Sequence, residues 1–204
     1  MKKETENYIP EEIETSCKRK TVSFYTLGCR VNQYETRGIA EQLFNSGFSI
    51  VPFGEPSDIA FINTCAVTAE SERKSLVAIK KGANASKHVI VAGCYSEHKP
   101  EKVKGIKNVS FVVGCKDKEK CVGAAKELLS LESSFSPISI CNAPPKNFPF
   151  ISGCRAYVKI QDGCDNRCAY CIIPFGRGKS RSAKSDFIID EINRYVSQGY
   201  KEVV

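Results

Sequence analysis

The chain has 204 residues and a mass of 22.5 kDa, of which 42% are apolar and 26% are charged. This composition is typical of a globular protein, and it excludes a chain disordered throughout, a collagen-like repeat and a multi-pass membrane protein. The formal net charge is +7 and the isoelectric point is about 8.8. A positive excess of this size permits a polyanionic partner such as RNA without requiring one.

The cysteine content is high and odd, at eleven residues. The N-terminal stretch MKKETENYIPEEIETS is charged throughout and lacks the apolar core of a signal peptide. No apolar run approaches the roughly 20 residues that a membrane helix needs. We therefore expect a cytoplasmic protein, in which thiols stay reduced and many cysteines favour metal or iron–sulfur ligation over disulfides.

Strand and helix patterns alternate from residue 21 to about residue 135, after a charged N-terminal extension at 1–20. The patterns predict strands at 22–27, 48–51, 59–62, 88–92 and 109–113, and helices at 32–45, 69–83 and 117–131, with a short helix beginning at Pro100. Asn32 with Glu35 reads as a capping box, and Thr68 reads as the cap of the next helix. The alternation predicts an α/β fold in which helices cover a parallel βαβ sheet of the Rossmann or flavodoxin type.

A second unit is expected at 153–204, after a linker at 136–152 that is rich in Ser, Pro and Asn. Its pattern predicts a strand at 156–160, a cysteine-rich loop, a helix at 185–198 and a strand beginning at 202. Such a start cannot bury both faces of a sheet, and a (β/α) barrel needs about 200 residues or more. We therefore expect 153–204 to be the beginning of a barrel and the chain to be the N-terminal part of a longer protein.

Three cysteines follow three predicted strands of the first unit. Cys29 stands in YTLGC, Cys65 in INTC and Cys94 in VAGC. Because the carboxyl ends of parallel strands form the ligand-binding edge of such a sheet, we expect these thiols to lie at one edge. Any one of them is more simply a small buried core residue, but three in the same position relative to a strand favour iron–sulfur or zinc ligation.

The cysteines outside the two sets of three carry weaker signals. Cys115 also follows a strand, in VVGC, and is the strongest rival for a fourth ligand. Cys17, Cys121, Cys141 and Cys154 show no comparable pattern, and we interpret them as structural or incidental.

The second unit carries the most specific signal in the chain. Cys164, Cys168 and Cys171 form a C-x3-C-x2-C loop directly after a predicted strand. Three thiolates at this spacing suit one [4Fe–4S] cluster with one iron left free. Structural zinc usually takes four ligands in C-x2-C pairs, and both histidines of the chain lie in the first unit. The loop therefore favours iron–sulfur over zinc.

A basic stretch follows this loop. It contains Arg177, Lys179, Arg181 and Lys184. These residues are either a solvated loop or a contact to a phosphate or a cofactor carboxylate. Gly178-Lys179-Ser180 resembles the end of a P-loop, but Ile173 stands where that motif needs glycine, which excludes it.

Taken together, TLGCRVNQYET, NTCAVT, VAGCYSE and the C-x3-C-x2-C loop resemble the radical S-adenosylmethionine (SAM) methylthiotransferase family from about residue 21 onward. The first motif, with RAYVKIQDGCDNRCAYCIIPFGRGKSRS, is most similar to the MtaB-like branch. The resemblance implies methylthiolation of carbon 2 of N6-threonylcarbamoyladenosine at position 37 of tRNA. The other branches act on isopentenyladenosine in tRNA or on an aspartate of a ribosomal protein, and both remain alternatives.

The resemblance also implies cofactors, ligands and partners. Cys164, Cys168 and Cys171 would hold the [4Fe–4S] cluster that binds SAM, and Cys29, Cys65 and Cys94 would hold an auxiliary [4Fe–4S] cluster. The partners implied are tRNA, an electron donor and a sulfur source, with no membrane. No catalytic side chain is assigned. A fragment of this length could bind clusters but would not turn over.

Two classes other than an enzyme remain open. A non-catalytic iron–sulfur or electron-transfer protein would be expected to supply four cysteines per cluster rather than three. A zinc-stabilised RNA-binding module would contain zinc in place of iron. The metal and sulfide content of anaerobically purified protein separates these classes.

Overall fold

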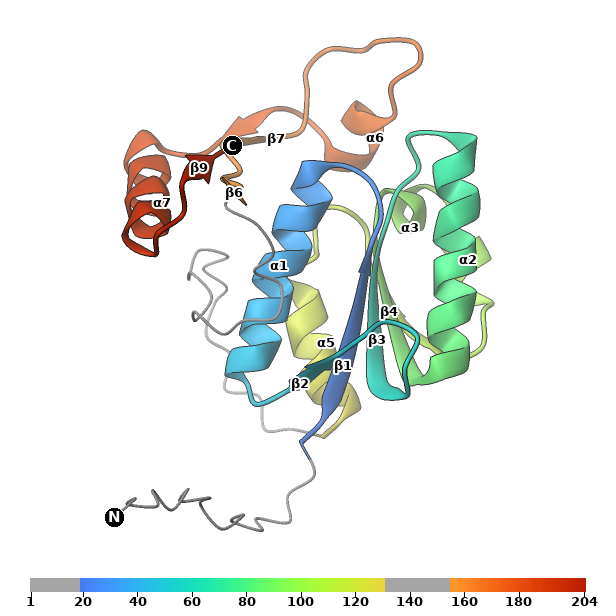
Figure 1. Ribbon diagram of the computed structural model, residues 1–204. Helices are drawn as coiled ribbons and strands as arrows, with labels where there is room; N and C mark the ends of the chain where they lie inside the picture. The colour runs from blue at the N-terminus through green and yellow to red at the C-terminus, as the bar shows by residue number, and fades with distance from the viewer. Residues whose placement is uncertain (1–18, 131–154) are drawn as a thin grey trace, which may run out of the picture.

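The structure is a computed structural model that describes residues 19–130 and 155–204. The predicted linker and three cysteines lie outside the described residues, namely Cys17, Cys141 and Cys154. A five-stranded parallel sheet forms the centre of the first part (Figure 1). Its strands are β1 (Thr21–Thr26), β2 (Ser49–Val51), β3 (Ser57–Thr64), β4 (Ser86–Gly93) and β5 (Val109–Val112).

The spatial order of the strands is β2-β1-β3-β4-β5, with every neighbouring pair parallel. This is the flavodoxin-type order, so the predicted α/β fold is confirmed for this part of the chain. The helices that connect the strands are α1 (Arg30–Asn45), α2 (Ala69–Ala85), α3 (Cys94–His98), α4 (Pro100–Lys104) and α5 (Lys120–Leu128). Figure 1 shows α1 and α5 on one face of the sheet and α2 with α3 on the other.

Apolar side chains fill both faces of the sheet, which explains why β3 and β4 read as nearly continuous apolar runs. On one face, Leu43 of α1 and Ala125 of α5 belong to a core cluster with β1, β3 and β4. On the other face, Ile79 of α2, Tyr95 of α3 and Val103 of α4 pack in a second cluster. The two cores hold the carboxyl ends of β1, β3 and β4 side by side.

The start of α1 differs from the prediction. The helix begins at Arg30 with Cys29 as its N-cap, and no side chain caps it, so the Asn32–Glu35 capping box is wrong. Asn32 lies one turn inside the helix and donates instead to the backbone oxygens of Leu27, at 2.7 Å, and Thr64, at 3.1 Å. These bonds tie α1 to two strand ends, a tertiary role that the local pattern could not reveal.

The second cap prediction is confirmed. Thr68 is the N-cap of α2, and its side chain accepts a hydrogen bond from the backbone N–H of Ser71 while the Ser71 hydroxyl lies against the Thr68 N–H. Helix α5 is shorter than predicted at both ends, because it begins at Lys120 and ends at Leu128.

The second described part consists of short elements. β6 (Arg155–Ala156) pairs in parallel with β9 (Glu202–Val203), and β7 (Gln161–Asp162) pairs antiparallel with β8 (Arg181–Ser182). Helices α6 (Ile173–Arg177) and α7 (Ser185–Ser197) lie between them.

The single predicted strand at 156–160 is wrong in extent, because this stretch changes partners along its length. The backbone N–H of Val158 donates to Val204, whereas the oxygen of Ile160 accepts from Ala183. In the part of the chain that the structure describes, no helix is long and apolar enough to span a membrane.

Candidate functional site

The three predicted ligands of the first part lie at the carboxyl edge of the sheet. Cys29 follows β1, Cys65 follows β3, and Cys94 follows β4 as the first residue of α3. These strands are neighbours in the sheet. Cys29 is exposed, whereas Cys65 and Cys94 are buried. The edge therefore presents thiols from three strand ends, as in other open α/β sheets whose ligands bind at this edge.

Two glycines at this edge allow the backbone to turn in close contact with the end of β3. Gly28 has a φ of +102°, and a Cβ placed on it would lie 3.0 Å from the Sγ of Cys65. Gly93 has a φ of +110°, and a Cβ there would collide with the backbone of Thr64. Only glycine accepts both the positive φ and the contact. The close approach places the turn before Cys29 directly against Cys65.

Cys115, the rival for a fourth ligand, lies against Cys94. Both thiols are buried and their sulfurs are 3.7 Å apart. Within residues 19–130 and 155–204, no three Cys, His, Asp or Glu side chains lie close enough together to hold a metal ion. The assignment of Cys29, Cys65 and Cys94 as one ligand set thus stays a prediction.

The Cys94–Cys115 pair is strongly polarised. The Cys115 thiol donates to Cys94, and this hydrogen bond is the main reason why the pKa of Cys94 lies below its usual range. Burial opposes the fall, while the positive charges of Arg177 and Lys118 add to it. The same hydrogen bond and burial raise the pKa of Cys115. Cys94 is accordingly the more acidic thiol of the pair, and the thiolate is the form that binds iron or zinc.

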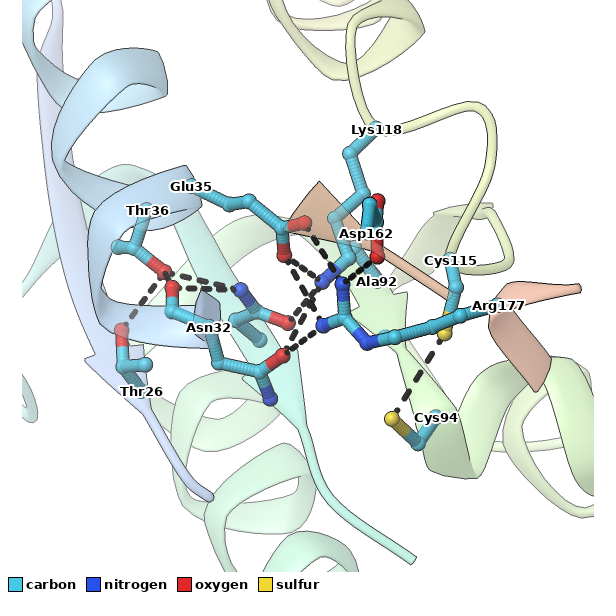
Figure 2. Close-up of polar contacts among 12 residues, drawn as sticks. Thr26, Asn32, Glu35, Thr36, Ala92, Cys94, Cys115, Lys118, Asp162 and Arg177 are labelled. Carbon is cyan, nitrogen blue, oxygen red and sulfur yellow. Dashed lines mark hydrogen bonds and ion pairs between the residues drawn. The ribbon is translucent and has the colours of Figure 1, made fainter. Parts of the chain in front are cut away.

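A buried charged network lies beside this pair (Figure 2). Its centre is Glu35, a residue of α1 whose carboxylate is 2.5 Å from the Nζ of Lys118 and 2.9 Å from Nη1 of Arg177. All three side chains are at least 94% buried. Lys159 also reaches Glu35, at 3.2 Å. Burial alone would raise the pKa of Glu35, but the cations outweigh it and hold this pKa below its usual range.

Two buried asparagines complete the network. The Asn32 side-chain oxygen accepts from Nη2 of Arg177 at 2.7 Å, and that of Asn63 accepts from Lys118 at 3.0 Å. The amide of Asn63 in turn donates to the backbone oxygen of Asn32 at 3.0 Å. Both asparagines are fully buried. Each buried cation therefore has a carboxylate and an amide oxygen as acceptors, which offsets its desolvation.

Arg177 joins the two described parts of the chain. It is the last residue of α6, and it also contacts Asp162 of β7 at 2.9 Å. The sequence predicted either a solvated loop or a phosphate contact for this residue, but its exposed fraction is 3% and its partners are protein carboxylates. Its neighbours in the basic stretch, Lys179, Arg181 and Lys184, are exposed. Arg181 lies 3.7 Å from Asp162 and donates to the backbone oxygen of Arg177 at 3.1 Å, so it too has protein partners.

A second contact between the two parts involves α1 and α7. Arg37 lies 5.5 Å from the ring centre of Tyr195 and 5.4 Å from that of Tyr200, and its Nη2 donates to the Tyr200 hydroxyl at 2.5 Å. Tyr34 donates to Glu191 at 3.3 Å. Helix α1, whose N-cap is Cys29, is thereby tied to the second part at Tyr34 and Arg37.

The C-x3-C-x2-C loop lies between β7 and α6 and projects from the molecule (Figure 1). Cys168 is exposed, and Cys164 and Cys171 are half-buried. The N–H of Cys164 donates to the oxygen of Gly178 at 3.0 Å, and that of Cys171 to the oxygen of Cys168 at 3.0 Å. The loop is thus closed at its base by backbone bonds, with its thiols accessible.

The residues of the charged network were missed as a site by sequence reasoning. Glu35 was assigned to a helix cap, and Lys118 carried no signal. The one available clue was that Asn32 and Glu35 are three residues apart, on one face of a helix that starts at Cys29.

The fold and site define a class: a parallel α/β domain with cysteines at its carboxyl edge, joined through buried charges to a unit with a three-cysteine loop. Residues 21–114 match the model of Uncharacterized protein family UPF0004. The threonylcarbamoyladenosine tRNA methylthiotransferase MtaB of Bacillus subtilis (strain 168) is 36% identical over 191 residues, which cover 90% of this chain and 42% of that protein. The MtaB protein of Aquifex aeolicus (strain VF5) is 33% identical over 190 residues, covering 90% and 46%.

A second kind of relative is the ribosomal protein uS12 methylthiotransferase RimO of Trichodesmium erythraeum (strain IMS101). It is 31% identical over 191 residues, which cover 91% of this chain and 43% of that protein. The chain thus spans less than half the length of these curated relatives. The chain is similar to methylthiotransferases of both the MtaB and the RimO kind, as the resemblance of its motifs predicts.

Proposed function

We propose that this chain is part of a radical-SAM tRNA methylthiotransferase that acts on carbon 2 of N6-threonylcarbamoyladenosine at position 37. The similarity to MtaB proteins along 90% of the chain carries the proposal, since it includes both sets of cysteines. The methylthiotransferase activity belongs to the whole protein. The described residues supply the proposed cluster ligands and the contacts between the two cysteine sites. We place the protein in the cytoplasm, where its tRNA substrate is found.

Both proposed sites supply cysteine thiols, which are the usual ligands of iron–sulfur clusters. At the sheet edge, the positive charges of Arg177 and Lys118 lower the pKa of Cys94 and favour an anion there. We propose Cys29, Cys65 and Cys94 as ligands of the auxiliary [4Fe–4S] cluster, with Cys115 left as a hydrogen-bond donor to Cys94. The loop thiols of Cys164, Cys168 and Cys171 are the proposed ligands of the SAM-binding cluster.

The chemistry of the reaction comes from the cofactors: SAM bound to its cluster supplies a 5′-deoxyadenosyl radical, and the auxiliary cluster carries the sulfur to be inserted. The protein's own residues would bind and orient these groups. The backbone bonds at Cys164 and Cys171 shape the loop, and Arg177 ties the end of α6 to α1. The exposed lysines Lys179 and Lys184 are the proposed contacts of the tRNA backbone, alongside a chain charge of +7.

Nucleoside mass spectrometry of tRNA from a strain that lacks the gene tests the proposal. The methylthio form of threonylcarbamoyladenosine should vanish, its precursor should accumulate, and the full-length gene should restore the product. The present chain alone should not restore it. If the methylthio group disappears from isopentenyladenosine instead, the substrate assignment is wrong and the reaction class stands.

Similarity to RimO at 31% identity favours a second candidate, modification of a ribosomal-protein aspartate. Intact-mass measurement of ribosomal proteins from the same deletion strain separates the two. Loss of a methylthio group from a ribosomal protein with unchanged tRNA would establish the RimO-like function. An electron donor and a sulfur source are required in either case.

A further inference from the structure

The thiols of Cys94 and Cys115 are placed so that they can react with each other. Cys94 follows β4 and Cys115 follows β5, and these two strands are neighbours in the sheet. Their sulfurs are hydrogen-bonded at 3.7 Å, as the dashed line in Figure 2 shows. A disulfide has a sulfur–sulfur distance of about 2.05 Å, so the two atoms would have to approach by roughly 1.7 Å. Small rotations of the two side chains supply a movement of this size.

Hydrogen bonds hold the two turns that carry these cysteines against each other. The Ser96 hydroxyl, at the start of α3, donates to the backbone oxygen of Val113 at 2.6 Å. The Glu97 carboxylate accepts from the backbone N–H of Cys115 at 3.0 Å. Both bonds join α3 to the segment after β5, so the fold keeps the two thiols in proximity. Proximity of this kind accelerates a reaction between two groups by orders of magnitude.

No other described cysteine has a partner placed in this way. All eight described cysteines are free thiols, and within residues 19–130 and 155–204 this is the one hydrogen-bonded pair among them. Cys121, six residues after Cys115, is fully buried in the core cluster on the α1 and α5 face of the sheet. In the folded chain the partner of Cys115 is therefore Cys94, although Cys121 is much nearer along the sequence.

A small cavity gives access to the pair. Its volume is about 70 Å³, and its lining includes Cys115, Lys116 and Arg181. The cavity reaches the surface because Lys116 and Arg181 are exposed, whereas each thiol is itself only 5% exposed. A cavity of about 10–15 Å³ holds one water molecule, so this one has room for hydrogen peroxide but excludes a bulky oxidant.

We propose that Cys94 and Cys115 are a redox-modification site, which closes into a reversible disulfide when the metal-free chain meets a small hydroperoxide such as H₂O₂. The thiol that reacts first attacks one oxygen of the peroxide, becomes a sulfenic acid and releases water. The second sulfur then attacks the sulfenic sulfur, which forms the disulfide and releases a second water. Two thiols and one H₂O₂ thus give one disulfide and two waters, and an added dithiol reverses the bridge by exchange.

The bridge removes Cys94 from the free thiols of the sheet edge. Every reaction of that thiol therefore depends on reducing conditions. The proposal concerns the two thiols alone, and it stands whether or not the proposed function is correct.

Tryptic peptide mapping of the 204-residue chain tests the proposal. The chain is reduced, freed of metal with a chelator and treated with one equivalent of H₂O₂, and the remaining thiols are alkylated. Because trypsin does not cleave between Lys99 and Pro100, it releases Cys94 in peptide 88–102 and Cys115 in peptide 108–116, each with a single cysteine. The disulfide between these peptides should be about tenfold more abundant than any other that contains Cys94, because the fold holds the two sulfurs together. Dithiothreitol should remove it.

Two controls show whether the fold selects this pair. Oxidation in concentrated urea should abolish the preference, because Cys115 in an unfolded chain meets the nearby Cys121 more readily than Cys94. Cys121→Ala, which removes a core thiol outside the pair, should leave the yield of the Cys94–Cys115 disulfide unchanged in the folded chain.

The outcomes are distinct. A disulfide that is selective in the folded chain, lost in urea and reversed by dithiothreitol supports the proposal. A bridge from Cys94 to Cys29 or Cys65 in its place, a sulfinic acid at either thiol without a bridge, or two unreacted thiols would each overturn it. Equal yields in the folded and unfolded chains would overturn it as well, because the arrangement of the two turns would then play no part. A yield that fell in Cys121→Ala would mean that a third thiol takes part, which refutes a site of two.

Discussion

Replacing the buried carboxylate of Glu35 should destabilise the protein strongly. Glu35→Gln keeps the size of the side chain but leaves Lys118 and Arg177, both more than 90% buried, without their shared anion. Breaking a buried ion pair by removing one partner typically costs about 3–5 kcal/mol. That is a large fraction of the roughly 5–15 kcal/mol by which domains are stable. We expect the urea midpoint of the metal-free chain to fall accordingly.

Glu70→Gln is the matched control. Glu70 also pairs with an arginine, Arg73 at 2.7 Å, but both side chains are more than half exposed. Surface pairs of this kind contribute little, so this variant should unfold at the parent midpoint. Equal destabilisation by the two substitutions would refute the reasoning, because it would show that burial does not set the cost of the unpaired charges.

The pH dependence gives an independent check on Glu35. Its cationic partners lower its pKa in the folded state, so its stabilising effect is fully present above the unfolded value of about 4.3. The effect is lost only as the pH falls below that value and through the lowered folded pKa. The difference in unfolding free energy between parent and Glu35→Gln should thus be constant from pH 5 to pH 8 and shrink below about pH 4. A difference that shrank near neutral pH would contradict a lowered pKa.

Three more predictions concern the cysteines and α1. Alanine at all three cysteines of the C-x3-C-x2-C loop should remove about half of the reconstituted iron and leave the spectrum of the other cluster, whereas loss of all iron would contradict two independent sites. Cys115→Ser should retain the auxiliary iron and Cys65→Ser should lose it, by iron and sulfide analysis; equal losses would refute the ligand assignment. Burial raises the pKa of Glu41 to about 7 in the folded state. Protonated Glu41 therefore makes its full contribution to the unfolding free energy below pH 4.5, and this contribution is lost as the pH rises through 7. Glu41→Gln should abolish this decline in urea titrations between pH 5 and pH 7, and an unchanged decline would show that Glu41 does not cause it.

Much of the α/β fold was predictable because its signals are local. The apolar runs of β3 and β4 and the Thr68 cap of α2 are read directly from neighbouring residues, and the structure confirms them. The predicted cap at Asn32 failed because its side chain bonds to two strand ends, one of which is Thr64, 32 residues away. The strand at 156–160 failed for a similar reason, since its partners are supplied by distant residues.

In the candidate site, too, the features with local signals were predictable and those that depend on distant residues were not. The positions of Cys29, Cys65 and Cys94 at one edge follow from the rule that parallel strands end together, so periodicity was enough to place them. The charged network could not be found this way. Glu35 and Arg177 are 142 residues apart, and nothing in either local sequence distinguishes a buried arginine from the exposed cations that follow it.

The network is also poorly explained as a source of stability alone. Well-packed apolar side chains of similar volume often stabilise a fold as much as a buried ion pair, or more. A set of charges that includes a buried donor without a partner among the described residues is worse still in that respect. Such a network permits only one arrangement of the chain segments that carry it, because Lys118 and Arg177 must both reach the carboxylate of Glu35. The carboxylate of Glu35 belongs to the helix that is capped by Cys29, and Arg177 belongs to the helix that follows Cys171. The network therefore fixes the two cysteine sites relative to each other.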